Sequence, residues 1–428
     1  MVFAVIAALF FLTTAVGIPI AFSTGLAAVG GILATGGIQL NVLVIRTLKA
    51  LDSFPLMAVP FFVLAGEVMA RGQVTERLVR FSEILVGRIS GGLAQAAIVA
   101  CTIFAGITGS STADATAIGS VMLPAMKAKK YPHDFSCAVI ASAAVLGPII
   151  PPSITFVIYS MATGVSIGGM FMAGIIPGLL IALGLMLVAY VISRRNHFPR
   201  AAEPLTWKET GTILRTSALS MMLPIIIVGG ILGGIFTPTE AAAVGAAYAI
   251  FLCVCILRTL PLRALPGILF ESAKISSIIW LLLATTNILV WVLAINNVGP
   301  AVERFFLSVS GNVYVFLLIL NLFLLVVGML MDTFPAIMIL APLLHPLAVQ
   351  LGVHPLHFGI IMSVNLLIGQ ITPPVGTNLF ILSAIGHISI EKLFRAIVPF
   401  LLIEIVVLFI LTYVPALTLW IPRMLGYL

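Results

Sequence analysis

Residues 147–153 read GPIIPPS and residues 369–378 read GQITPPVGTN, and each stretch interrupts a long apolar segment. A pair of prolines leaves carbonyl groups of the preceding turn without donors, so a helix kinks or unwinds there. Inside a bilayer such a break is tolerated only where protein or a cavity satisfies the freed backbone groups. Two breaks of this kind predict one shared cavity within a membrane protein.

The composition around these breaks also requires a membrane. Of the 428 residues, 61% are hydrophobic and 8% are charged, which is too little polar surface to cover a soluble protein of this size. The apolar stretches run for roughly 17 to 30 residues, which is the length of a membrane-spanning helix. We predict an all-α polytopic protein surrounded by membrane lipid, with spans at about 2–17, 19–37, 55–71, 134–163, 166–192, 217–236, 240–257, 266–295, 354–386 and 397–425.

The net charge of +7 does not indicate a nucleic-acid partner. The 21 Lys and Arg residues occupy short connections between the apolar segments, as expected when basic loops stay in the cytoplasm. Placing these loops in the cytoplasm puts the N-terminus outside. We therefore expect a multi-pass protein of the inner-membrane type and no nucleic acid bound to it.

Two more apolar regions, residues 90–127 and 312–349, are interrupted midway by polar, glycine-containing or proline-containing sequence. The interruptions read GITGSSTAD from Gly106 and GMLMDTFPA from Gly328. Apolar arms on both sides of such an interruption fit a re-entrant helical hairpin, which enters the membrane and returns to the same side. We predict one re-entrant hairpin in each half of the chain.

The two halves of the chain are related by an internal repeat. Asp114 and Asp332 match at an offset of 218 positions, as do Pro124 and Pro342. At an offset of 222 positions, residues at and after the first proline pair fall on identical residues at and after the second: Pro151, Pro152, Thr155, Ala162, Gly164, Ile175, Pro177, Leu179, Leu180 and Ile181. The difference between the offsets predicts a small insertion between hairpin and broken helix.

The repeat divides the chain into four predicted parts. Residues 1–89 supply scaffold spans and an interfacial arm near Leu40 to Ser53, and residues 90–192 supply the first hairpin, a broken helix and a span. Residues 193–310 and 311–428 repeat the scaffold and the transport elements. The basic loops fit an inverted repeat, and paired broken elements in inverted repeats are typical of secondary transporters, with sites near the midplane.

The first hairpin tip and the first proline break carry oxygen atoms suited to a hard cation. Na⁺ needs several oxygen ligands, and carbonyls at half-helix ends together with hydroxyls supply them without heavy charge. An acid within an apolar segment is functional by default, which makes Asp114 and Asp332 the first choices. The predicted first Na⁺ site comprises Gly109, Ser110, Ser111, Thr112, Asp114, Gly147, Pro151, Ser153 and Thr155.

The repeat predicts a second Na⁺ site in the other half, and two sites imply more than one coupled ion. Its residues are Gly328, Met331, Asp332, Thr333, Thr372, Gly376, Thr377 and Asn378. Proton transfer through Asp114 and Asp332 remains an alternative to sodium. The competing interpretation is that these small residues only allow close helix packing. Glu240, which follows Thr237, is interpreted as part of a helix cap and not as a site residue.

The sequence does not indicate an enzyme. It contains no G-x-S-x-G, no H-E-x-x-H, no phosphate-binding G-x-x-x-x-G-K-[ST] and no glycine-rich dinucleotide turn, so direct use of ATP is also not expected. A channel and a membrane-embedded hydrolase are the alternatives from other classes. A channel would conduct without saturation, and a hydrolase would need Ser110 or Ser111 beside a base such as His133.

Several stretches resemble the large membrane subunit of tripartite ATP-independent periplasmic (TRAP) transporters over nearly the whole chain. They are SFPLMAVPFFVLAGEVM from Ser53, GSSTADATAIGSVMLPAM from Gly109, GPIIPPSI from Gly147, GIFTPTEAAAVGA from Gly234 and GQITPPVGTNLF from Gly369. The resemblance implies an elevator-type Na⁺ symporter in the bacterial inner membrane, in which a domain containing both hairpins moves against a scaffold. It places sodium at the two hairpin tips and the opposing proline breaks.

The resemblance also implies two protein partners and a class of substrate. A small four-helix membrane subunit would enlarge the scaffold, and a soluble periplasmic protein would capture an organic acid and deliver it. C4-dicarboxylates, sialic acids and sugar acids all fit, because selectivity in that family resides largely in the binding protein. The alternative is a stand-alone Na⁺- or H⁺-coupled carboxylate symporter of the wider ion-transporter superfamily, which would need no binding protein.

Overall fold

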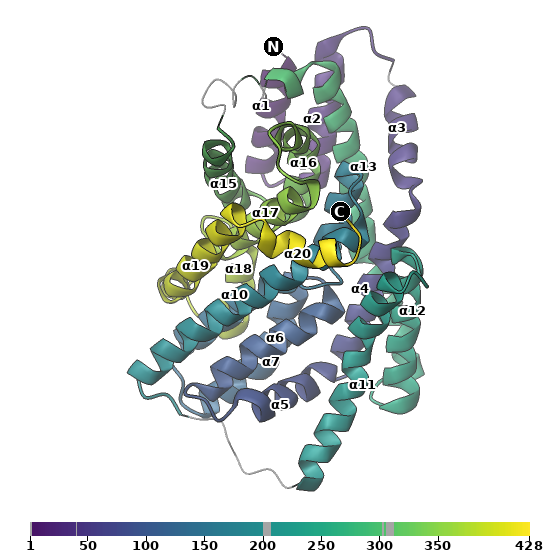
Figure 1. The fold of residues 1–428 in the computed structure, drawn as a ribbon. Helices are drawn as coiled ribbons and strands as arrows, with labels where there is room; N and C mark the ends of the chain where they lie inside the picture. The colour runs from purple at the N-terminus through teal and green to yellow at the C-terminus, as the bar shows by residue number, and fades with distance from the viewer. Residues whose placement is uncertain (1, 40, 200–206, 302–303, 305–311) are drawn as a thin grey trace.

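The computed structural model describes residues 2–39, 41–199, 207–301, 304 and 312–428, and these residues form an all-helical protein (Figure 1). Leu40, where the interfacial arm is predicted to begin, and the predicted domain boundary at 310 lie outside the described residues. The first half contains α1 (Val2–Ala15), α2 (Ile20–Thr35), α3 (Asn41–Leu51), α4 (Ala58–Arg71), α5 (Val74–Val86), α6 (Gly92–Thr108), α7 (Ser111–Ala128), α8 (His133–Ala144), α9 (Ile154–Thr163) and α10 (Ile167–Arg195). The second half contains α11 (Trp207–Leu232), α12 (Pro238–Phe251), α13 (Leu265–Ile295), α15 (Val313–Leu330), α16 (Thr333–Gln350), α17 (Pro355–Ile368), α18 (Thr377–Gly386), α19 (Ile390–Tyr413) and α20 (Ala416–Met424).

Within the described part of the chain, eight helical segments are long and apolar enough to cross a membrane, which agrees with the predicted polytopic class. Both α15 and α16 are among them. The predicted segments 134–163 and 354–386 are each divided into two shorter helices, α8 with α9 and α17 with α18. The predicted last span, 397–425, is wrong in its limits, because α19 starts seven residues earlier and ends before Pro415, which separates it from α20.

The helix bounds repeat along the chain at an offset of 222 positions. The helices α7 and α16 are both 18 residues long, and each bound of α16 lies 222 positions after the matching bound of α7. The ends of α6 and α15, and the starts of α8 and α17, differ by the same offset. The two proline pairs follow it too, and both Pro-Pro bonds are cis.

This single offset corrects the predicted pairing of the two acids. Ser110 is the N-cap of α7 and Asp332 is the N-cap of α16, so these two residues are equivalent at an offset of 222. Asp114 is then equivalent to Ala336, and no insertion separates each hairpin from its broken helix. The match of identical acids was misleading, because a helix start is set by its cap. The interior prolines that correspond are Pro124 and Pro346.

Side-chain caps fix the starts of the helices around the breaks. Ser110, Ser153 and Asp332 each accept a hydrogen bond from a backbone N–H of the first turn, at 3.5, 3.2 and 2.8 Å. Such caps satisfy donors that the first turn of a helix leaves free. Glu240 and Thr237 form the predicted cap at the start of α12, with reciprocal bonds of 2.8 and 3.3 Å, so the structural interpretation of Glu240 is confirmed.

The helices of the two predicted scaffold regions pack largely on one another, except that α5 packs mainly against α6. Figure 1 shows α13 running along α2 and α3 to reach α4, and α12 beside α4. The amphipathic arm α3 buries none of its residues within this chain, and its Arg46 guanidinium lies 4.9 Å from the centre of the Trp291 ring of α13. These helices leave one side of α4 and α13 facing the hairpin tips.

The helices of the two predicted transport regions interleave. α7 of the first half packs against α18 of the second, and the equivalent pair α16 and α9 packs in the reciprocal way. α8 packs against α19, and α17 packs against α10. Each half therefore completes the core of the other. The first proline break is buried in this common body, whereas Pro374 and Val375 of the second break are exposed.

A hydrogen bond between Tyr159 of α9 and His345 of α16 joins the halves, with 2.8 Å between the phenol oxygen and Nδ1. Tyr159 is fully buried. We expect Tyr159→Phe to lower the free energy of unfolding by about 1 kcal/mol, the net value of one buried hydrogen bond. The melting temperature of the purified protein measures the change. Tyr190→Phe, at a position bonded only weakly to Arg194 (3.5 Å), is the control and should melt like the wild type.

Candidate functional site

The residues that join α6 to α7, at the predicted first hairpin tip, lie directly against the first proline break. Gly109 closes α6 in the left-handed region with φ of 61°, and a Cβ there would come within 2.9 Å of the Pro152 carbonyl oxygen and 3.2 Å of the Ile154 nitrogen. Only glycine fits that conformation and that approach without strain. The tip and the break therefore form one surface, to which residues 109–114 and 147–155 both contribute.

Asp114 places a carboxylate inside this surface. It is fully buried, and its Oδ1 accepts a hydrogen bond from the Thr108 hydroxyl. Its Oδ2 has no hydrogen-bond partner among the described residues. A Cβ on Gly147 would lie 2.7 Å from that Oδ2 and 2.8 Å from the Ser110 carbonyl oxygen, so both oxygens approach the same glycine. An unpartnered buried carboxylate oxygen is costly unless a cation or a proton neutralises it.

The remaining predicted residues of the first site differ in whether their oxygen atoms are already hydrogen-bonded within the fold. Thr155 is fully buried, and its hydroxyl has no partner within the described residues. Ser153 is used by the fold, because it donates to the Pro148 carbonyl at 2.5 Å and accepts from the Phe156 N–H. Thr112 lies nearer the surface, where its hydroxyl is 3.1 Å from that of Ser110. The Pro151 carbonyl faces the other way, toward Gly106 of α6.

The residues that join α15 to α16, at the predicted second hairpin tip, lie against the second break in the same manner. A Cβ on Gly328 would come within 3.0 Å of the Leu366 carbonyl oxygen, and the Val375 N–H donates to the Met329 carbonyl at 3.1 Å. Met331 is the extended residue between the two arms of the tip. Asp332 and Thr333 follow it, and both accept hydrogen bonds from the Gln370 amide, at 3.2 and 3.1 Å.

The far side of the second break also presents oxygen atoms. Thr377 has a buried hydroxyl oxygen without a partner, as does the equivalent Thr155, and the amide oxygen of Asn378 is likewise unpartnered in the part of the chain that is described. Gly376, with φ of 50°, turns the chain into α18. Thr372 is used locally, since its hydroxyl donates to the Ile368 carbonyl at 2.9 Å.

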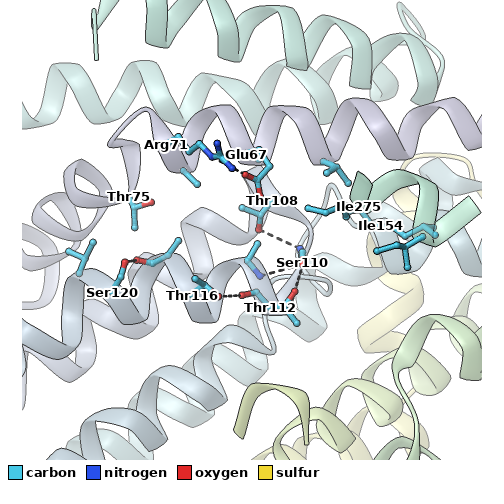
Figure 2. Close-up of a pocket in the computed structure, with 18 of the residues that line it drawn as sticks. Glu67, Arg71, Thr75, Thr108, Ser110, Thr112, Thr116, Ser120, Ile154 and Ile275 are labelled. Carbon is cyan, nitrogen blue, oxygen red and sulfur yellow. Dashed lines mark hydrogen bonds and ion pairs between the residues drawn. The ribbon is translucent and has the colours of Figure 1, made fainter. Parts of the chain in front are cut away.

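A cavity of about 680 Å³ lies between the scaffold and the tips. Figure 2 shows hydroxyls of α7 along one wall and the ion pair of Arg71 and Glu67 on α4 opposite, with 3.3 Å between Nε and the carboxylate oxygen. The same cavity is lined by Ile275 of α13 and by Asp332 of the second tip. Its lining hydroxyls are those of Thr75, Thr108, Ser110, Thr112, Thr116 and Ser120.

The donor sets at both tips fit a hard monovalent cation. Each combines a carboxylate, hydroxyl oxygens and nearby backbone carbonyls, and each includes buried oxygens with no partner among the residues described. Oxygen ligands of low total charge suit Na⁺ better than a transition metal. The equivalent threonines Thr155 and Thr377 would serve the two sites in the same way.

Several residues at the site were not predicted from the sequence, and three of them make the most informative contacts. Thr108 binds the Asp114 carboxylate from inside α6, Gln370 bonds to both tips, and Arg71 faces the cavity although it was interpreted only as a cytoplasmic charge. Gln370 could have been noticed, because it is a polar side chain inside the proline motif, beside residues that were selected. Thr108 could have been noticed for the same reason, because it is a polar residue inside the interruption that begins at Gly106.

Comparison with known proteins agrees with the architecture. Residues 7–417 match the model of the tripartite ATP-independent periplasmic transporter family, DctM component. The chain is 39% identical to the C4-dicarboxylate TRAP transporter large permease protein DctM of Pseudomonas aeruginosa, over 94% of each chain. It is 36% identical to the sialic acid TRAP transporter large permease protein SiaM of Vibrio cholerae, over 96% of each.

The fold is also similar to that of a solved transporter. The YdaH transporter of Alcanivorax borkumensis superposes with a TM-score of 0.65 over 87% of each chain, at 14% sequence identity. That likeness concerns the fold alone. Because the family model spans nearly the whole chain and the relatives match from end to end, this protein belongs to the large membrane subunits of the TRAP transporters, which are multi-pass proteins of the inner membrane.

Proposed function

We propose that this chain imports organic acids by Na⁺ symport, with the substrate delivered by a periplasmic binding protein. The cavity carries the proposal, because it lies between the scaffold and both tips and is lined by hydroxyls and one arginine. Relatives are named for C4-dicarboxylate, sialic acid and 2,3-diketo-L-gulonate, all of which are organic acids. A guanidinium binds the carboxylate of an organic acid, and hydroxyl groups bind the polar groups on the rest of the substrate.

The charges around the cavity support coupling to cations. Arg71 is already paired with Glu67, and Glu76 and Asp332 add two further acids to the lining. An organic anion entering such a cavity is repelled unless positive charge is bound nearby. Sodium ions at the two tips would supply that charge, so that substrate and cations bind together. Protons on Asp114 and Asp332 are the alternative source of neutralisation.

We propose that the two halves form an inverted repeat, each with a re-entrant hairpin. The two hairpins and the two broken helices would move together as one body. The 222-residue repeat and the reciprocal packing of α7 with α18 and α16 with α9 support it, since the two halves share one core. In an elevator mechanism this body, with both tips and both proline breaks, would slide along α4 and α13. The cavity lies at that boundary and would be carried across the membrane.

Two partners complete the proposed transporter. The small membrane subunit would cover lipid-facing surface of the scaffold, and the periplasmic protein would present the substrate to the cavity from outside. The family name itself describes a tripartite system with a periplasmic component. Coupling to the ion gradient would take place in this chain, because the candidate Na⁺ ligands at both tips belong to it.

The function is tested by uptake into proteoliposomes that contain this chain and its small subunit, with the binding protein added outside. Labelled C4-dicarboxylate and sialic acid are the first substrates to compare. We expect uptake only with an inward Na⁺ gradient and the binding protein present. Equal uptake in K⁺ would refute sodium coupling, and full uptake without the binding protein would favour a stand-alone symporter.

Arg71 is expected to set the affinity of the cavity for the substrate carboxylate. Arg71→Gln should weaken binding of labelled substrate to the purified membrane subunits about tenfold, the loss expected when a charged hydrogen bond is removed. Glu67→Gln frees the Arg71 guanidinium from its ion pair and should strengthen binding of the substrate. Arg80→Gln removes an exposed cation of α5 outside the cavity lining and serves as the control. Equal affinities in all three variants would contradict this assignment.

A further inference from the structure

The Gln370 side chain bonds to both hairpin tips at once. It lies in the second proline break and is 7% exposed. Its Oε1 accepts a hydrogen bond from the Ser111 hydroxyl of α7, while its Nε2 donates to Asp332 Oδ1 and Thr333 Oγ1 of the second tip. One planar amide therefore connects the two candidate cation sites.

The position of this amide follows from the repeat. Ser111 and Thr333 are equivalent at the offset of 222, as the first residues of α7 and α16. The residue equivalent to Gln370 is Pro148, which has no side-chain donor or acceptor. At this position of the repeat only the second half supplies a polar side chain, so the surroundings of the two sites differ chemically.

The orientation of the amide has opposite consequences for the two tips. Ser111 donates its hydrogen to Gln370, so its lone pairs stay free for a cation. Asp332 Oδ1 and Thr333 Oγ1 instead receive N–H groups, and each is an oxygen that a cation could use. An amide has its acceptor and its donors at opposite ends, so turning Oε1 toward a second-tip cation would turn the NH₂ group onto Ser111.

We infer that Gln370 is a positioning residue that couples the two cation sites negatively, favouring binding at the first tip and opposing it at the second. This inference rests on the proposed sodium symport. Because turning the amide costs free energy, the dissociation constant of the second tip is larger than that of the first. The first tip therefore binds its cation before the second.

Equilibrium binding of radiolabelled Na⁺ to the purified complex with the small subunit tests the coupling. Asp114→Asn and Asp332→Asn assign the two dissociation constants to the first and second tips. In Gln370→Met, which preserves the length of the side chain, the ratio of the second constant to the first should fall about tenfold, as expected for loss of a hydrogen bond to a charged group.

Ser111→Ala provides a second route that leaves Gln370 in place. Removing the hydroxyl lets the amide turn at less cost, so affinity at the second tip should rise although the change lies in the other half. In the Gln370→Met background the same substitution should leave the second tip unchanged. A residue with a purely structural role would not produce this dependence.

Gln95→Met is the matched control, because Gln95 is also a buried glutamine that joins two helices, donating to the Met186 carbonyl at 2.9 Å. It should lower stability without altering the ratio. Two bound ions with an unchanged ratio in Gln370→Met would overturn the coupling and leave sodium symport intact. Absence of Na⁺ binding by the wild type would overturn both.

Discussion

Asp114→Asn should weaken Na⁺ binding at the first tip about 100-fold or more. The Oδ2 of this carboxylate is buried without a partner among the described residues, and it faces the same glycine as the Ser110 carbonyl. Removing the charged partner of a buried cation costs about 3 kcal/mol or more, and each 1.4 kcal/mol is about a tenfold change in affinity. Equilibrium binding of labelled Na⁺ measures the loss.

The same substitution should weaken Na⁺ binding without lowering the melting temperature in the absence of Na⁺. Without Na⁺, asparagine removes an uncompensated buried charge, so Asp114→Asn should melt no lower than the wild type in potassium buffer. In sodium buffer the wild type should melt higher. Asp134→Asn, at an exposed aspartate in the first turn of α8, is the control and should change neither result. Normal Na⁺ affinity in Asp114→Asn would rule out this carboxylate as a ligand.

Gly369→Ala should lower stability more than the other substitutions considered. Gly369 begins the second proline break, and a Cβ there would overlap the backbone of Gly328 at the hairpin. Neither backbone can yield without separating tip from break, so we expect a loss of about 3 kcal/mol, at the upper end of overpacking in a core. Thermal unfolding of the purified protein measures the loss, and Na⁺ affinity at the second tip should fall with it.

A graded series keeps this prediction testable if Gly369→Ala does not fold. Gly328→Ala meets its nearest atom, the Leu366 carbonyl oxygen, at 3.0 Å, so its effect should have the same direction and a smaller size. Gly229→Ala has open space around the added methyl in the exposed interior of α11 and should be neutral or slightly stabilising. Equal melting temperatures for all three variants would contradict the close approach.

The larger features of the fold were predictable because they follow from chain length and backbone chemistry. Apolar segments of sufficient length predicted membrane helices, and the proline pairs predicted the interruptions between α8 and α9 and between α17 and α18. The repeat was found from identical residues near the prolines. Its extension to the hairpins was misaligned by four positions, because Asp114 and Asp332 are the same residue type but play different parts in their helices.

The location of the candidate site was predicted from the sequence, but only some of the side chains that could bind a cation were. Ser153 and Thr372 were chosen as hydroxyls beside the breaks, yet both hydroxyls are used by the local backbone. Thr155 and Thr377 are the hydroxyls left without partners within the described residues. Sequence spacing gives the residues near a break, whereas the direction of each side chain depends on the caps and on packing between halves. Gln370 could have been selected as a polar residue of the proline motif, but its partners could not be predicted, because Ser111, Asp332 and Thr333 lie 259, 38 and 37 positions away.

Sodium binding at the two tips is the central claim, and a thermal titration without substrate tests it most directly. The melting temperature of the purified protein is followed across increasing Na⁺, with K⁺ keeping the ionic strength constant, because a ligand that binds only the folded state raises it. We predict a saturable rise that K⁺ does not produce, reduced in Asp114→Asn and in Asp332→Asn. The same melting temperature in Na⁺ and K⁺ at every concentration would contradict the account.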